Sequence, residues 1–120
     1  MGRPEFKHGS FIIKDYSGRK LQLYERAWTH ITKERNRDYF ERLFDKIVET
    51  IRNPSQVRKS TQENNVVIYE KAFDDFYIAN TVLGRAYINV VVNWNTNRIR
   101  TVYPSRRKRQ KGKLIWPTKK

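Results

Sequence analysis

The side chains of this chain that could do chemistry are an imidazole and a set of cations, hydroxyls and phenols. They fall in four groups along the sequence: His30, Arg58–Ser60, Tyr69 with Lys71, and Arg100–Tyr103. Imidazole titrates near neutrality, so it can act as a base or as an acid. The guanidinium fork of Arg fits phosphate oxygens, and Tyr can donate a hydrogen bond or stack on a base.

Metal-free cleavage of RNA needs these residue types. A base takes the proton of a ribose 2′-OH, which attacks the neighbouring phosphorus, and an acid protonates the leaving 5′ oxygen. Cations stabilise the charge that grows on the phosphoryl oxygens. Each candidate also has a structural interpretation: a His between apolar residues is often half-buried, strand cations are often solvated, and Tyr69 and Tyr103 can be core residues.

The charge balance favours a polyanionic partner. The chain has 120 residues, and 26 Lys and Arg against 12 Asp and Glu give a net charge of +14. A domain this basic is expected to bind nucleic acid or an anionic membrane surface. A basic run close after the last candidate group adds further cations for such binding: Arg106, Arg107, Lys108 and Arg109.

Several classes of protein are disfavoured by what the sequence lacks. With no cysteine and two histidines, we expect no disulfide framework, no metal site and no cofactor. No apolar run approaches the length of a membrane span and no secretory signal is visible, which predicts a cytoplasmic protein with no membrane partner. No phosphate-binding glycine loop and no nucleophile elbow is present.

Two strands joined by a polar turn are the clearest feature of the second half. Tyr87–Trp94 alternates between two faces and is rich in β-branched and aromatic residues, which is typical of a strand. Asn95–Asn97 supplies the turn, because Asn tolerates left-handed backbone. Arg98–Tyr103 is the predicted return strand, and Pro104 is expected to end it.

The periodicity predicts a helix over Asp38–Arg52, with Asn36 as its N-cap and Pro54 just beyond its end. Its apolar residues recur at helical spacing and are expected to pack on the sheet that contains Tyr87–Trp94: Phe40, Leu43, Phe44, Ile47 and Ile51. A shorter helix at Glu25–Lys33 would carry His30 beside apolar neighbours.

The other strands predict the fold class. They are expected at Phe11–Lys14, Leu21–Tyr24, Val57–Ser60, Val66–Phe73 and Phe76–Val82. Asp74–Asp75 is predicted to turn the chain, and Leu83–Gly84 to form the bend of a hairpin. This order predicts an α+β fold, with N-terminal helices packed on one face of an antiparallel sheet of about four to five strands.

The composition divides the chain into three segments. Residues 1–10 are predicted to be a flexible arm, residues 11–104 a single domain and residues 105–120 a basic tail. Ile115 and Trp116 interrupt the tail. We expect them to dock on the domain, and the alternative is that Trp116 stacks on a base.

Short motifs, taken in order, resemble phage-associated members of the barnase/EndoU/colicin/RelE-like (BECR) nuclease superfamily. The motifs are Trp28-x-His30-Ile31, Ile51-x-Asn53-Pro54, Val57–Ser60, Val66–Tyr69, Val90–Val92 and Arg98–Tyr103. The resemblance covers about Leu21–Tyr103. It implies helices followed by an antiparallel sheet that carries an RNA site, and a metal-independent RNase that in many members is a toxin.

The resemblance also implies roles for individual residues. His30 matches the family's histidine, Arg58 and Lys59 match its basic pair after the helix, and Thr101 and Tyr103 match polar residues of its last strand. The full set of candidate catalytic residues is His30, Arg58, Lys59, Lys71, Thr101 and Tyr103. The full set of candidate nucleic-acid-binding residues is Tyr69, Arg98, Arg100, Arg106, Arg107, Lys108 and Arg109.

One departure from the family counts against activity. Many relatives have a second histidine where this chain has Asn36, and Asn cannot transfer a proton. Either Asn36 only caps the helix, or the missing role has passed to a Tyr, Lys or Arg.

The expected function is therefore a toxin-like endoribonuclease that leaves a 2′,3′-cyclic phosphate, with RNA as substrate and an acidic antitoxin or immunity protein as partner. The alternatives are a non-catalytic RNA- or DNA-binding module and an assembly protein whose tail neutralises nucleic acid. His30 discriminates between them, because a catalytic His must lie beside the strand cations, whereas a structural one faces the core.

Overall fold

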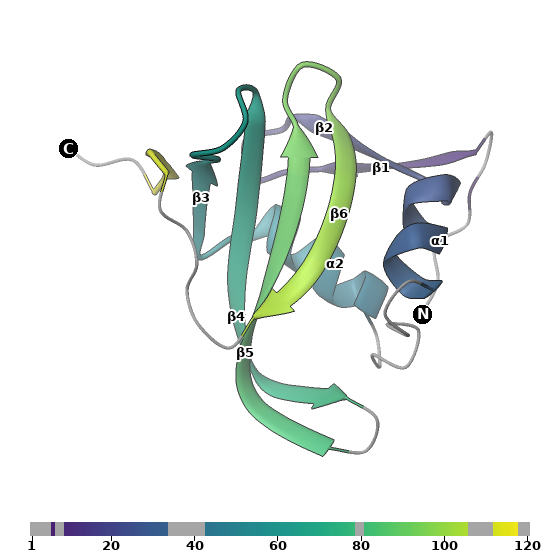
Figure 1. Cartoon of the computed structure of the whole chain (residues 1–120), viewed down its shortest axis with the longest axis vertical. Helices are drawn as coiled ribbons and strands as arrows, with labels where there is room; N and C mark the ends of the chain where they lie inside the picture. The colour runs from purple at the N-terminus through teal and green to yellow at the C-terminus, as the bar shows by residue number, and fades with distance from the viewer. Residues whose placement is uncertain (1–5, 7–8, 34–42, 79–80, 106–111, 118–120) are drawn as a thin grey trace.

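Most of the described chain is β-strand. The computed structural model describes residues 6, 9–33, 43–78, 81–105 and 112–117, and for residues 33, 75–78 and 81–85 it describes the backbone alone. The elements in chain order are β1 (Ser10–Lys14), β2 (Lys20–Tyr24), α1 (Glu25–Lys33), α2 (Leu43–Arg52), β3 (Gln56–Lys59), β4 (Val66–Ile78), β5 (Thr81–Asn93), β6 (Arg98–Ser105) and β7 (Leu114–Trp116). The strands form a single sheet in the order β1-β2-β6-β5-β4-β3-β7 (Figure 1).

The sheet is mixed because β2 runs parallel to β6, whereas every other strand pair is antiparallel. The parallel pair is short and aligns Gln22 with Arg98. The backbone N–H of Gln22 donates to the carbonyl of Asn97 at 2.7 Å. The sheet curls, so the β1–β2 hairpin crosses behind the central strands (Figure 1), and α2 contacts both β1 and the strands β4 and β5.

The predicted fold class is wrong. The protein is a curled, mixed half-barrel of seven strands with only two helices in its described part, and not N-terminal helices on an antiparallel sheet of four to five strands. The physical reason lies in the two ends of the chain. Ile13, Leu21 and Leu23 are almost completely buried, so the first hairpin joins the common core and extends the sheet. At the other end, β7 pairs with β3.

The predicted turns within the sheet also need correction. The chain does not turn at Asp74–Asp75, because β4 continues to Ile78 through an irregularity in register between Phe73 and Phe76. Gly84 pairs with Phe76 inside β5 and is not at a bend. Pro104 lies within β6, opposite Ile88. Because β2 pairs with β6 only at Arg98, this part of β6 is an edge, where a proline is tolerated.

The core lies between α2 and the sheet, as predicted. Leu43, Phe44, Ile47 and Ile51 are buried on α2. They face the inward side of β5, where Ile88, Val90 and Val92 are fully buried. The Phe44 ring packs edge-on against Phe11 at 5.2 Å and against Trp28 at 6.0 Å, so it joins β1, α1 and α2. The predicted positions Asn36, Asp38 and Phe40 lie outside the described residues. Neither described helix is long and apolar enough to cross a membrane.

We expect Phe44→Ala to lower the free energy of unfolding by about 3–5 kcal/mol, because it removes a ring that three elements share and leaves a cavity. Urea unfolding measures this loss. Thr29→Ala, at an exposed position of α1, is the matched control and should change stability by less than about 0.5 kcal/mol. A similar small change for Phe44→Ala would contradict this description of the core.

Candidate functional site

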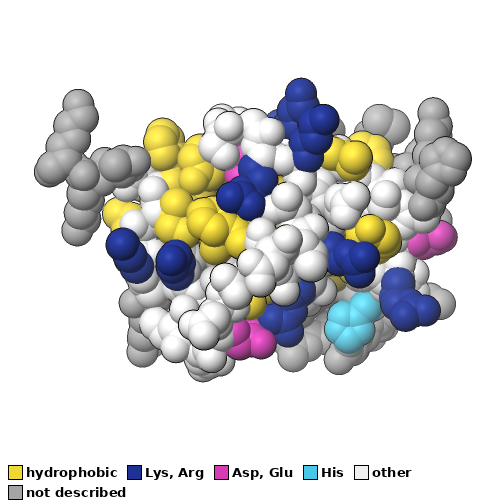
Figure 2. Space-filling model, turned by 90° about the horizontal axis from the view of Figure 1, so that it is seen from above, with side chains coloured by type: hydrophobic (Ala, Val, Ile, Leu, Met, Phe, Trp, Pro, Cys, Tyr) yellow, Lys and Arg dark blue, Asp and Glu magenta, His cyan; other side chains and the backbone are white. Residues whose placement is uncertain are grey.

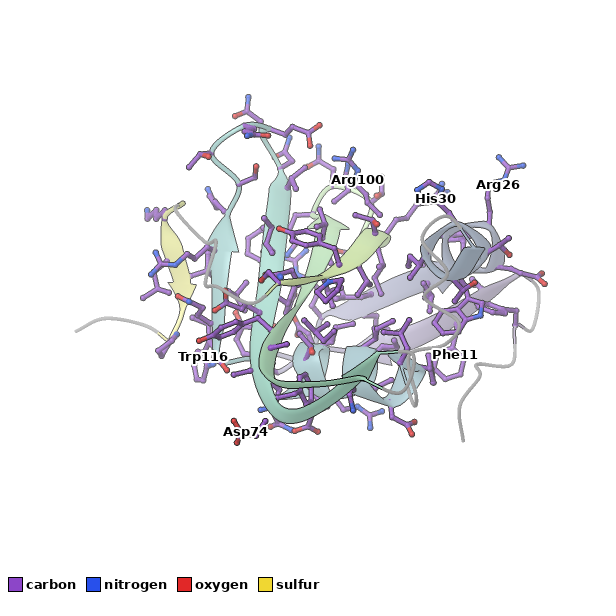
Figure 3. The ribbon with its side chains drawn as sticks, turned by 60° about the horizontal axis from the view of Figure 1, so that its bottom comes forward. Phe11, Arg26, His30, Asp74, Arg100 and Trp116 are labelled. Carbon is purple, nitrogen blue, oxygen red and sulfur yellow. The ribbon has the colours of Figure 1, made fainter. Side chains whose placement is uncertain are left out.

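A pocket of about 490 Å³ opens where α1 meets the start of β6. Its lining combines an imidazole, cations and a phenol: Tyr24, Arg26, Ala27, His30, Arg98, Ile99 and Arg100. Figure 3 shows the side chains of Arg26, His30 and Arg100 along the same side of the molecule. In Figure 2 the cyan histidine is flanked by dark blue Lys and Arg side chains. Here two segments that are about seventy residues apart in sequence form one cationic surface.

His30 faces solvent beside the strand cations. Its helix buries Trp28 and Ile31 in the core, and successive helical residues are turned by about 100°. His30 is therefore directed outward and is exposed. Its apolar neighbours in the sequence had suggested an interior position. It shares the pocket with Arg98 and Arg100. His30 thus lies beside the strand cations and does not face the core.

The pocket contains two residues that the sequence reasoning missed, Arg26 and Tyr24. Arg26 lies one helical turn before His30, a spacing that puts both side chains on one face of α1 and could have identified it. Tyr24 is the last residue of β2. The Arg98 guanidinium lies 4.5 Å from the centre of the Tyr24 ring, a cation–π contact. The Tyr24 hydroxyl donates to Gln22 Oε1 at 3.1 Å.

Arg100 reaches the pocket because of an irregularity in β6. Val92 pairs with Ile99 whereas Val91 pairs with Thr101, so Arg100 is the extra residue of a β-bulge. Bulges redirect side chains in this way. The Arg100 Nη1 donates to Glu63 Oε2 at 2.7 Å, and both side chains are about half exposed. Glu63 belongs to the loop between β3 and β4, so the ion pair joins that loop to the pocket.

A second polar group lies on the outer face of the central strands. Arg58 donates from Nε to Gln56 Oε1 and from Nη1 to the carbonyl of Gly112, both at 2.8 Å. Gln56 Nε2 in turn donates to Glu70 Oε1 at 2.6 Å. Glu70 is fully buried, and its Oε2 has no hydrogen-bond partner among the described residues. Arg58 is therefore fixed to the sheet by hydrogen bonds and does not line the His30 pocket.

The register places the β6 candidates on the same outer face. Thr101 pairs with Val91, and Tyr103 pairs with Asn89, which is itself opposite Glu70. The amide of Asn89 donates to the Tyr103 carbonyl at 3.2 Å and to a neighbouring hydroxyl at 3.0 Å. Residues directly opposite one another in an antiparallel pair share a face. Thr101 and Tyr103 thus continue along β6 from the pocket but are not part of its lining.

Three other candidates lie away from the pocket. Lys71 Nζ is 2.9 Å from the Asn53 carbonyl and 3.7 Å from Glu49 Oε2, beside the end of α2. Lys59 is exposed on β3, where its backbone pairs with Lys113. Tyr69 is fully buried, so its ring offers no surface to a base. The candidates 106–109 lie outside the described residues.

The Tyr69 phenol has a structural role. Its hydroxyl donates to Asp15 Oδ2 at 2.5 Å. Burial, and then this hydrogen bond, raise the pKa of Tyr69 well above its ordinary value. The other oxygen of Asp15 accepts hydrogen bonds from the Ser17 N–H, the Ser17 hydroxyl and the Arg19 N–H. This network holds the β1–β2 turn against the sheet.

No group of three or more His, Cys, Asp or Glu that could hold a metal ion occurs within the part of the chain that the structure describes. The donor atoms of the pocket are instead nitrogens of Arg and His and a phenol oxygen. Such a set suits an anion, because guanidinium groups carry only donors and a permanent charge.

Neutralising the two buried carboxyl groups, Glu70 and Asp15, should change the stability of the protein in different directions. We expect Glu70→Gln to leave the free energy of unfolding unchanged or to raise it by up to about 1 kcal/mol, because one of the Glu70 oxygens has no partner among the residues that the structure describes. Asp15→Asn should lower it by about 1–3 kcal/mol, since an amide nitrogen cannot accept the hydrogen bonds that the carboxyl receives. Urea unfolding of both variants measures the difference, and an equal loss in the two would contradict it.

Comparison with known proteins identifies the family of this chain. The family model of phage-Barnase-EndoU-ColicinE5/D-RelE like nuclease 2 (PBECR2) matches residues 3–117, which is nearly the whole chain. No curated protein and no solved structure gives a significant match. The match confirms the resemblance that the sequence motifs indicated, and a nuclease function agrees with a cationic pocket that contains an imidazole. The chain therefore belongs to the PBECR2 family of nucleases.

Proposed function

We propose that this nuclease is a metal-independent endoribonuclease, which cleaves RNA by attack of a ribose 2′-OH and leaves a 2′,3′-cyclic phosphate. The observation that carries the proposal is that His30 shares one surface pocket with Arg98 and Arg100. The nuclease family supports phosphodiester chemistry in general. RNA is proposed as the substrate because an imidazole base beside cations suits attack by a neighbouring hydroxyl, which DNA lacks.

Each part of the cleavage step has a candidate group in the pocket. His30 accepts the proton of the 2′-OH, whose oxygen forms a new bond to phosphorus. Arg98 and Arg100 bind the phosphoryl oxygens as negative charge grows on them. The bond from phosphorus to the 5′ oxygen breaks, and that oxygen takes a proton. Tyr24 has a hydroxyl in the pocket lining that can supply this proton. Tyr24 therefore acts as the general acid, a role that Asn36 cannot fill because its amide does not transfer protons.

The charge of the chain supports a wider biological proposal. A small basic enzyme of net charge +14 that cuts RNA in the cytoplasm would damage the cell that makes it. We therefore propose a toxin-like role, with an acidic antitoxin or immunity protein as the partner that covers the cationic pocket. Complementary charge would give fast association that weakens with salt.

A non-catalytic RNA- or DNA-binding module is the second candidate. The observation that favours it is the pocket lining, which contains one imidazole and no carboxylate and so offers a single conventional proton acceptor. Such a module would use the same cations for phosphate binding. Only a rate measurement separates the two functions.

We expect His30→Ala to lower the single-turnover rate of RNA cleavage in EDTA by about 10²–10⁴-fold, the usual contribution of a positioned general base. RNA affinity and melting temperature should change little, because His30 is exposed and the pocket cations remain. Thr29→Ala, on the same helix, is the matched control and should keep the parent rate. Full activity of His30→Ala would exclude the mechanism, and the absence of cleavage by the parent would favour the binding module.

We expect Glu63→Gln to tighten RNA binding by roughly 2–5-fold, because the phosphate no longer competes with a carboxylate for Arg100 in an exposed ion pair. The control is Asp74→Asn, which makes the same change in net charge at an exposed position (Figure 3) away from Arg100. Binding is measured with a non-cleavable 2′-O-methyl oligonucleotide at fixed salt. Equal tightening by both variants would show a general charge effect rather than competition at Arg100.

A further inference from the structure

A second pocket, of about 510 Å³, lies at the other end of the molecule from His30. It is lined by the β1–β2 turn, the C-terminal end of α2 and β7, through Tyr16, Ser17, Arg52, Asn53, Pro54 and Trp116. Figure 3 shows Trp116 and His30 at opposite ends of the structure. No residue lines both pockets. The proposed cleavage mechanism makes no use of this second pocket.

The pocket contains an aromatic pair. The Tyr16 and Trp116 ring centres are 4.9 Å apart and their planes are inclined by 30°. Trp116 is 38% exposed, and among the described residues only it and Ile12 are large hydrophobic side chains of that exposure. Ile115, its neighbour on β7, packs against the core as predicted, and Trp116 docks on Tyr16 while part of its ring stays exposed.

The aromatic pair rests on a fixed base. The Tyr16 N–H donates to the Ile51 carbonyl at 3.2 Å, and the Tyr16 ring packs on buried Tyr69 at 6.2 Å. Trp116 pairs with Val57 of β3. The segment that leads into β7 approaches β3 so closely that a Cβ on Gly112 would lie 1.5 Å from the Lys59 carbonyl oxygen. A ligand at this pocket would therefore meet a surface that is already formed.

A cation stands beside the aromatic pair. Arg52 is exposed in the last turn of α2 and lines the pocket. The Lys71 ammonium lies 2.9 Å from the carbonyl of Asn53, another residue of the lining, and also forms an ion pair with Glu49 at 3.7 Å, so Arg52 is the cation of the pocket lining. Exposed aromatic rings next to cations are the combination with which proteins bind single-stranded nucleic acid, since bases stack on the rings and phosphates bind the cations.

We propose that this pocket is an accessory binding site for single-stranded RNA, in which one base stacks on Trp116 and the adjacent phosphate binds Arg52. The proposal rests on RNA being the substrate of the nuclease. The site holds RNA away from the cleavage pocket, so it contributes to the affinity for long RNA and not to the chemical step. A substrate of two nucleotides, which occupies only the His30 pocket, gains nothing from it.

The test is the binding of a non-cleavable 2′-O-methyl hexaadenylate to the full chain, followed by tryptophan fluorescence. Trp116 is the exposed tryptophan of the three, so the oligonucleotide should quench its emission and protect it from iodide. Trp116→Ala should weaken binding about 10-fold, and Trp116→Phe less, because a phenyl ring still stacks. Arg52→Ala should weaken binding and reduce its salt dependence.

Two controls match these changes. Ile12→Ala removes the other exposed hydrophobic side chain, and Lys14→Ala removes an exposed cation on β1. Both should bind the oligonucleotide like the parent after the change in net charge is allowed for. Melting temperatures identify any variant that has lost its fold. Fluorescence quenching in the parent chain tests the site without any variant.

The outcomes separate this inference from the proposed function. Trp116-dependent binding without RNA cleavage would sustain the accessory site and reject the ribonuclease. Cleavage of long RNA that Trp116→Ala and Arg52→Ala leave unchanged, with no quenching in the parent, would reject the accessory site alone. AMP that binds as tightly as the hexamer would overturn the proposal in favour of a free-nucleotide site.

Discussion

The pairing of β2 with β6 is the constraint on which the candidate active site depends. A single parallel step, with Gln22 opposite Arg98, ties the N-terminal hairpin to the end of the central sheet. The helix α1 follows β2 directly, so the same step brings His30 beside the cations of β6. The packing of α1 on β6 and the burial of the hairpin in the common core hold the imidazole in the same place. The geometry of the site is thus a consequence of long-range sheet pairing.

The surfaces around the two pockets form in the same way: apolar side chains of one element pack on the core, and its other side chains face solvent. At one end α1 buries Trp28 and Ile31 and turns its polar face outward. At the other end β7 adds to β3, packs Ile115 inward and leaves Trp116 exposed. Between them the outer face of the central strands contains a buried carboxyl group, and one of its oxygens has no hydrogen-bond partner in the described part of the chain, which costs stability. Arg58 is linked to that group through Gln56 and keeps a fixed orientation.

Sequence reasoning found the local elements and missed the long-range ones. The apolar stripe of α2 and the alternation of β5 were predicted correctly, because helical and strand periodicities depend only on residues that are close in sequence. The joining of β2 to β6, the bulge at Arg100 and the addition of β7 depend on contacts between distant segments, which no local pattern specifies. The family was indicated by short motifs in order. The helical spacing to His30 could also have identified Arg26, whereas the place of Tyr24 in the pocket depends on the pairing of distant strands.

The central claim is that the pocket around His30 cuts RNA by attack of a 2′-OH. The most direct test is incubation of the purified chain, in EDTA, with an end-labelled strand that is DNA except for one ribose. We expect cleavage only after that ribose, with a 2′,3′-cyclic phosphate or its 3′-phosphate hydrolysis product at the new end. Cleavage of the all-DNA strand, a requirement for magnesium, or products with a 5′-phosphate would contradict the mechanism.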